Sequence, residues 1–194
     1  MRNNIVRAIS IVLILVGLGA ISYGIYYKRE TAIAQESLFK DFNNVLKKIE
    51  NGEIKEPEDV EVSEVKVDAI ALLEIPKIGL KVAVAEGTSD DIISHAVGHF
   101  VETAHPGQVG NCALVGHRNF TTGEFFLKIN KLELGDEVKV TTYNNTYVYK
   151  VTGQQVVNPE DIQVLSPTPT PTITLVTCTW DGDKRLIVKG ELVK

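Results

Sequence analysis

The sequence predicts a mostly β-stranded domain behind an N-terminal membrane helix. Residues 8–27 are apolar and uncharged, and a helix of about 20 such residues spans the hydrocarbon core of a bilayer. Further along, β-branched and aliphatic runs are separated by Gly, Pro, Asn and Asp, which is typical of short strands that close into a barrel. The runs are 65–73, 79–85, 110–116, 137–143, 146–157, 172–178 and 185–193.

The N-terminal apolar run has two interpretations. Ala32-Ile33-Ala34 has the small-x-small pattern of a signal-peptide cleavage site. However, a cleaved signal normally has an apolar region of about 7–15 residues, and the charged residues 28–30 separate this run from the site. We therefore favour an uncleaved anchor over residues 1–30. Its orientation does not follow from charge, because two basic residues lie on each side of the run.

Residues 31–66 connect the anchor to the folded domain. Residues 51–64 hold six acidic residues against one lysine, which indicates a solvated spacer that holds the domain off the membrane. Residues 67–194 form a domain long enough to bury a core without disulfides. Before the spacer, apolar residues at helical spacing predict an amphipathic helix over 31–49: Leu38, Phe42, Val45, Leu46 and Ile49.

The composition argues against nucleic-acid binding. The formal net charge is −5, and the sequence has no cluster of Lys and Arg with interleaved aromatic residues. Proteins that bind nucleic acids need such a basic surface to neutralise phosphates. We therefore expect no nucleic-acid partner.

The strand that ends at Cys178 carries the strongest chemical signal. Asp181-Gly182 follows it at once, and a type I′ turn centred on these two residues would place Arg185 directly opposite Cys178. The two Cβ atoms would then lie about 4.5–5.5 Å apart. A permanently charged guanidinium beside a thiol favours the thiolate. The alternative is a small core cysteine and an unrelated surface arginine.

A second apolar strand ends on a histidine. Residues 111–115 lead through Gly116 into His117 and Arg118, and strand ends are a common place for catalytic groups because the scaffold there is rigid. A thiol, an imidazole and a guanidinium together are a set that nucleophilic catalysis can use.

These residues resemble the sortases, the membrane-anchored cysteine transpeptidases of Gram-positive bacteria. The hallmark of that family is a Thr-Leu-x-Thr-Cys strand with a downstream Arg and an upstream Gly-His, and residues 174–178 read Thr-Leu-Val-Thr-Cys. The resemblance covers residues 68–194 and implies an eight-stranded sortase-type β-barrel with one or two short helices. Residues 89–96 form one such helix by their own pattern. By the same resemblance His117, Cys178 and Arg185 are the catalytic residues.

The resemblance also implies substrates and location. The acyl donor would be a surface protein with a C-terminal LPxTG-like sorting signal, cleaved after its Thr. The acceptor would be an amine of the peptidoglycan precursor, lipid II. The N-terminus would lie in the cytoplasm and the catalytic domain outside the cell, attached to the membrane through residues 8–27.

The segment 156–171 lies where the family carries its substrate loop, just before the cysteine strand. Ile162, Val164 and Leu165 are candidate walls for the Leu-Pro part of the sorting signal. The same side chains could instead tether the loop to the barrel.

The short Cys-to-Arg connection and the N-terminal anchor look most like class D sortases, with class A or E next. A pilin-type sortase is an alternative, but the sequence shows neither an Asp-Pro-aromatic lid nor a second apolar segment. A catalytically silent, membrane-tethered binding domain is another. A cysteine L,D-transpeptidase fits less well, because the cysteine of that family follows His-Gly whereas Cys178 follows Val176-Thr177.

The sequence gives weaker indications of a functional role for the other histidines and the second cysteine. His95 and His99 have the spacing of two metal ligands on one helix face, but Gly98 ends the expected helix between them and no third ligand is evident. His105 rivals His117 as the general acid, and the family pattern favours His117. Cys112 is expected to be a packed, free thiol.

The sequence predicts no cofactor and no essential metal. Some sortases bind calcium between two loops, but residues 103–110 contain no carboxylate. Glu102, Glu160 and Asp161 are a small set for an ion that takes about 6–8 oxygen ligands. We therefore do not expect a calcium site.

Overall fold

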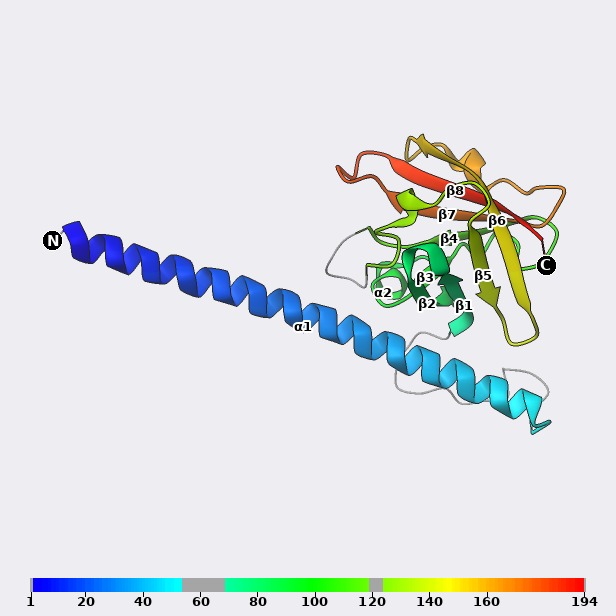
Figure 1. Ribbon diagram of the computed structural model, residues 1–194, viewed down its shortest axis with the longest axis horizontal. Coiled ribbons are helices and arrows are strands. Elements are labelled where there is room, and N and C mark those ends of the chain that lie inside the picture. Colours follow the sequence, from blue (N-terminus) through cyan, green and yellow to red (C-terminus); the bar gives the residue numbers. More distant parts are fainter. Residues whose placement is uncertain (1, 54–68, 119–123, 194) are drawn as a thin grey trace.

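A computed structural model describes residues 2–53, 69–118 and 124–193 (Figure 1). The predicted eight-stranded barrel is confirmed, with the strands closed in the order β1-β2-β3-β4-β7-β8-β6-β5. The pairs β2–β3 and β4–β7 are parallel. The strands are β1 (Ala69–Ile75), β2 (Leu80–Glu86), β3 (Val97–His99), β4 (Asn111–Val115), β5 (Glu137–Thr141), β6 (Thr146–Val157), β7 (Thr172–Cys178) and β8 (Arg185–Leu192).

Alternate residues of these strands fill the barrel, as the period of two along a strand requires. Leu73, Leu114 and Leu175 are among the fully buried side chains from three different strands. Phe125 and Phe126, which come after β4 in the chain, belong to the same core. The described part of the domain also has three short 3₁₀ helices: η2 (Pro76–Ile78), η3 (Ile129–Lys131) and η4 (Ile162–Leu165).

The segment after β2 differs from the prediction. The helix expected over 89–96 is only one turn, α2 (Asp90–Ile93), with Ser89 at its N-cap position. Strand β3 (Val97–His99) was not predicted, because three residues with a central glycine show no periodicity. Gly98 is required there, because a Cβ atom would collide with the main-chain oxygen of Gly87.

The two predicted N-terminal helices are one continuous helix, α1 (Arg2–Glu50). Its first half extends away from the barrel and its second half runs along β1 and β2 (Figure 1). The large apolar side chains described between residues 9 and 26 are more than half exposed. Among the described residues, this one helix is long and apolar enough to cross a membrane.

The second half of α1 packs against the barrel. Leu38, Phe42 and Val45 are buried, and the Phe42 ring stacks on Tyr143 with centroids 4.3 Å apart. Gln35 accepts a hydrogen bond of 2.9 Å from the main-chain N–H of Ala83. The amphipathic helix expected over 31–49 is therefore present and forms part of the domain, while most of the predicted acidic spacer lies outside the described residues.

Candidate active site

The parallel pairing of β4 with β7 determines where His117 and Cys178 lie. The register runs in steps from Asn111 opposite Thr172 to Val115 opposite Val176. It continues beyond β4, because the N–H of Gly116 donates to the oxygen of Val176 (3.2 Å) and the Thr177 hydroxyl donates to the oxygen of Gly116 (2.7 Å). The next step is His117 and Cys178. Both residues are therefore at the same end of the barrel, and both are half-buried.

The backbone at His117 is held by the core below it. The main-chain N–H of Phe126 donates to the oxygen of His117 (3.0 Å). A Cβ atom on Gly116 would lie 2.9 Å from the Phe126 ring, so only glycine allows this close approach. These contacts direct the chain out of β4 toward the end of β7.

Arg185 lies directly opposite Cys178 in the antiparallel β7–β8 pair, so the predicted register is confirmed. One guanidinium nitrogen of Arg185, Nη1, donates to the oxygens of Gly182 and Lys184, both at 3.2 Å. These bonds hold the guanidinium over the hairpin loop.

The predicted two-residue turn is wrong, although the register is right. The N–H of Gly182 donates to the oxygen of Thr179 (3.0 Å), so Trp180 and Asp181 are the central residues of the turn. Among the described non-glycine residues only Glu124 has a positive φ, whereas a type I′ turn needs positive φ at both central positions. The different turn does not change the pairing of Cys178 with Arg185, because the N–H of Thr179 donates to the oxygen of Lys184 (2.9 Å).

Arg118, for which the sequence predicts no role, contacts the end of β7. Its Nη1 lies 3.4 Å from the main-chain oxygen of Cys178, to which it donates, and its guanidinium carbon lies 4.7 Å from the centre of the Trp180 ring. Its Nε is buried without a hydrogen-bond partner among the described residues. Burial lowers the pKa of Arg118. The one indication in the sequence is position, because Arg118 directly follows His117 where the chain leaves β4.

A pocket of about 580 Å³ lies beside η4. Ile162 and Leu165 line it, whereas Val164 does not. The oxygen of Val164 instead accepts a hydrogen bond of 3.0 Å from the side chain of Asn111, at the start of β4, so this residue anchors the segment. The lining residues are Thr88, Phe100, Val101, Glu102, Thr103, Ile162, Gln163, Leu165 and Ser166.

His105 lies away from this end of the barrel. The N–H of Ala104 donates to the oxygen of Asn111 (3.1 Å), which places the neighbouring His105 at the start of β4, while His117 follows the end of that strand. His95 and His99 do not form a pair of metal ligands on one helix face. Nδ1 of His95 bonds the oxygen of Asp91 (2.8 Å), and His99 belongs to β3.

Both cysteines are free. Cys112 is 1 % exposed, and burial, assisted by the charge of Glu86, raises its pKa to about 12. Cys112 is therefore a neutral core thiol, and Cys178 is the accessible one.

The barrel, with a thiol and an imidazole at the ends of two parallel strands, defines a class of cysteine-dependent acyl-transfer enzymes. The sequence profile of the Sortase domain family matches residues 73–193. The chain therefore belongs to the sortase family, whose members are cysteine transpeptidases.

Known proteins similar to the chain include members of several sortase classes. Sortase SrtE1 of Streptomyces coelicolor is 41 % identical over 142 residues, which are 64 % of this chain and only 40 % of that protein. Sortase A of Bacillus anthracis is 28 % identical over 203 residues, covering 99 % of this chain and 96 % of the relative. The solved structure of a Clostridium perfringens Sortase D5 transpeptidase matches with a TM-score of 0.66 and 36 % identity, covering 87 % of this chain and 99 % of that one.

Proposed function

We propose that this sortase cleaves an LPxTG-like sorting signal of surface proteins after its Thr and joins the acyl group to an amine of the peptidoglycan precursor, lipid II. Cys178 is the nucleophile, His117 the general acid and base, and Arg185 the oxyanion donor. The observation that carries the proposal is the register of β7, which pairs with β4 on one side and β8 on the other. Those two pairings bring all three residues to one end of the barrel.

In the acylation step, the Cys178 thiolate attacks the carbonyl carbon of the Thr in the sorting signal. The carbonyl oxygen becomes negative, and the Arg185 guanidinium donates hydrogen bonds to it. The C–N bond then breaks, and protonated His117 gives its proton to the leaving amine. The products are a thioester on Cys178 and the released C-terminal peptide.

In the second step an amine attacks the thioester carbonyl while neutral His117 takes one of its protons. The C–S bond breaks and the Cys178 thiolate is regenerated, with a new amide bond on the acceptor. Water can attack in place of the amine, and hydrolysis is then the side reaction.

The pocket beside η4 is the proposed site for the Leu-Pro part of the signal. Ile162 and Leu165 give it an apolar wall, as an aliphatic side chain and a proline ring require. The oxygen of Val164 accepts a hydrogen bond from Asn111, which ties η4 to the start of β4. We expect the peptide to follow β4, which leads from Asn111 toward His117, so that its Thr lies at Cys178.

We further propose that the enzyme is of class D, with class A or E next. The Sortase D5 structure combines 36 % identity with coverage of 87 % of this chain, which extends into α1. The S. coelicolor Sortase E1 structure covers 65 % of the chain, and Sortase A of B. anthracis covers 99 % at a lower identity of 28 %. We further propose that the first half of α1 anchors the enzyme with its N-terminus in the cytoplasm and the barrel outside the cell.

The test uses the full chain in detergent micelles with a quenched fluorescent LPxTG peptide and an amine acceptor. We expect cleavage and a peptide-amine product of the calculated mass, and neither with Cys178→Ala. Cys112→Ala is the matched control, because it removes the other thiol and should retain turnover.

Two results would overturn the proposal. One is turnover that survives Cys178→Ala. The other is no turnover with any of a panel of sorting-signal variants, although the protein is folded and its Cys178 reacts with a thiol reagent; this result would favour the silent binding domain.

A further inference from the structure

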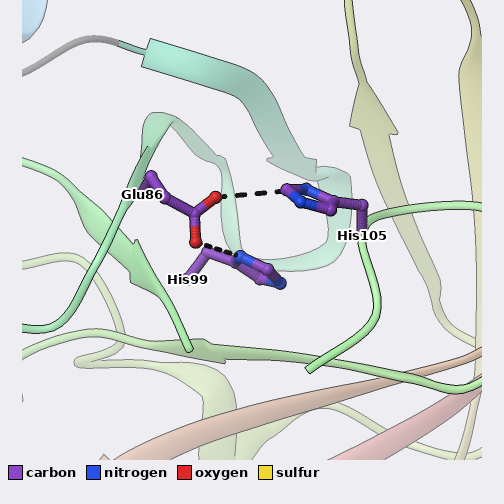
Figure 2. A group of neighbouring side chains, drawn as sticks. All are labelled: Glu86, His99 and His105. Atoms are coloured by element: carbon purple, nitrogen blue, oxygen red, sulfur yellow. Dashed lines mark hydrogen bonds and ion pairs between the residues drawn. The ribbon is translucent and has the colours of Figure 1, made fainter. Parts of the chain in front are cut away.

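A second cluster of reactive side chains lies at the start of β4, away from Cys178. It consists of Glu86 at the end of β2, His99 on β3 and His105 in the loop before β4. Figure 2 shows both imidazole rings turned toward the Glu86 carboxylate. The atoms that the three residues offer to a metal all lie within 4.8 Å of one another.

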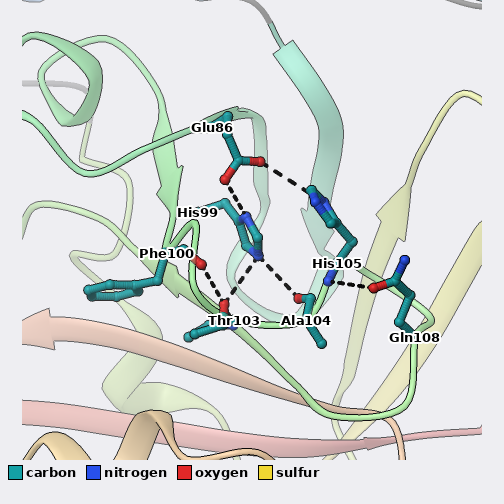
Figure 3. Close-up of polar contacts among 8 residues, drawn as sticks. Glu86, His99, Phe100, Thr103, Ala104, His105 and Gln108 are labelled. Atoms are coloured by element: carbon teal, nitrogen blue, oxygen red, sulfur yellow. Dashed lines mark hydrogen bonds and ion pairs between the residues drawn. The ribbon is translucent and has the colours of Figure 1, made fainter.

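The hydrogen bonds of His99 identify which of its ring nitrogens carries a proton. Nε2 lies 3.1 Å from the carbonyl oxygen of Ala104, which can only accept. It also lies 3.2 Å from the Thr103 hydroxyl, which donates its own hydrogen to the oxygen of Phe100 (2.7 Å). Figure 3 shows these contacts on the side of the ring that faces away from Glu86. Nε2 is therefore the donor, and the lone pair of a neutral ring is on Nδ1.

That lone pair points at a carboxylate. Nδ1 of His99 lies 2.8 Å from Oε1 of Glu86, and the His99 side chain is fully buried. Two acceptors at this distance repel each other unless a positive group, either a proton or a metal cation, lies between them. The neighbouring His105 offers a second Nδ1, 4.0 Å from the other carboxylate oxygen of Glu86.

We propose that Glu86, His99 and His105 bind a divalent transition-metal ion, with Zn²⁺ the best-fitting cation. Two imidazoles and one carboxylate suit Zn²⁺, whereas Ca²⁺ takes about 6–8 oxygen ligands. Tetrahedral Zn²⁺ with bonds of about 2.0–2.1 Å needs ligand atoms about 3.3 Å apart. Nδ1 of His99 lies 2.8 Å from Oε1 of Glu86 and Nδ1 of His105 lies 4.0 Å from Oε2, so side-chain adjustment on binding would bring the ligand atoms to that spacing. The Nε2–H bond from His99 to the carbonyl of Ala104 is the outer contact that orients metal-binding histidines.

The cluster can be reached from solvent. The His105 side chain is 55 % exposed and that of Glu86 is 36 % exposed, so an ion can enter and a water molecule can complete the coordination. A bound metal would join the end of β2 to the loop before β4. It would also fix Thr103, which bonds His99 and lines the 580 Å³ pocket.

The test is Zn²⁺ binding by isothermal titration calorimetry on the full chain in detergent, purified without a polyhistidine tag. The Cys178→Ala background removes the accessible thiol as a competing ligand. We expect a single saturable Zn²⁺ site that His105→Ala weakens about tenfold or more and that Ca²⁺ does not occupy. His95→Ala is the matched control, because it removes a histidine outside the cluster and should leave the affinity unchanged.

Glu86→Gln provides a second variant, because it keeps the shape of the side chain and removes its charge. It should also weaken binding, and Zn²⁺ should raise the unfolding temperature of the parent but not of this variant. The proposal is overturned if no saturable Zn²⁺ binding occurs, since a proton then fills the position between Glu86 and His99. It is equally overturned if His105→Ala and His95→Ala bind Zn²⁺ alike. Neither readout depends on transpeptidase activity.

Discussion

Cys178 and Arg185 face each other across the β7–β8 hairpin as a directly opposed pair. The pairing fixes the two backbones, while the Arg185 guanidinium is held over the loop by the carbonyl oxygens of Gly182 and Lys184. The thiol and its proposed oxyanion donor are therefore adjacent in the ladder. We expect a rotation of the Arg185 side chain, without backbone movement, to bring the guanidinium to a bound substrate.

Removing the guanidinium should abolish most turnover without unfolding the barrel. Arg185→Ala is expected to lower kcat about 10²–10³-fold, as the loss of one oxyanion donor does. Arg185→Lys keeps the charge but loses the planar fork of donors, so its loss should be smaller. Both variants are measured with the quenched peptide, and unfolding temperature serves as the control for folding. Equal activity of Arg185→Ala and the parent would exclude the assigned role.

Arg118 is expected to position the end of β7. Its guanidinium covers the ring of Trp180, the only tryptophan in the sequence, so the stack can be followed by intrinsic fluorescence. Arg118→Met should increase acrylamide quenching of Trp180 and lower kcat, because the Cys178 carbonyl loses its donor. If turnover falls while quenching stays the same, the contact between Arg118 and Trp180 is not what positions the end of β7.

The contact of α1 with the barrel should contribute measurably to stability. Phe42 is 1 % exposed and stacks on Tyr143, so Phe42→Ala should cost about 3 kcal/mol in free energy of unfolding. The measurement is denaturant unfolding of the full chain in detergent, followed by circular dichroism. Ile33→Ala is the matched control on the same helix, because Ile33 is 65 % exposed and its truncation should change stability by less than about 0.5 kcal/mol. Equal effects of the two variants would mean that the helix does not dock.

Burial of Cys112 predicts a loss of stability at alkaline pH. Its pKa is raised to about 12 in the folded chain, whereas an unfolded thiol ionises near about 8.5. Between these values the unfolded state gives up a proton that the folded state keeps, so the free energy of unfolding falls as pH rises, by up to about 1.4 kcal/mol per pH unit. Tyr149, whose pKa burial also raises, adds to the fall above about pH 10.

Cys112→Ala separates the contribution of the thiol from that of Tyr149. The variant should be less stable at neutral pH because it leaves a cavity, yet its unfolding free energy should decline less steeply between about pH 9 and 10. Denaturant titrations of both proteins at each pH give the slopes. Parallel slopes would show that Cys112 does not titrate on unfolding.

The sequence was most informative where structure repeats regularly. Seven of the eight strands follow from β-branched runs between turn residues, and only β3 was missed, because its three residues include Gly98. The continuity of α1 was hidden by Lys28, Arg29 and Glu30, which interrupt the apolar pattern. These residues are nevertheless good helix formers, so the backbone continues through them.

The proposed site could be predicted only in part for a similar reason. Strand register determines the positions of Cys178, Arg185 and His117, and this register can be read from the sequence. The contact of Arg118 with Trp180 and the meeting of Glu86, His99 and His105 depend on how loops pack. Local sequence contains no periodic signal for such contacts.

The most direct test of the central claim is the mass of the covalent intermediate. The full chain is mixed with a saturating LPxTG peptide, quenched in acid within the first turnovers and mapped by mass spectrometry after proteolysis. We predict the acyl fragment ending in Thr as a thioester on Cys178, and its disappearance when an amine acceptor is added. An acyl group on any other residue, or cleavage of the peptide with no acyl-enzyme under any quench time, would contradict the mechanism.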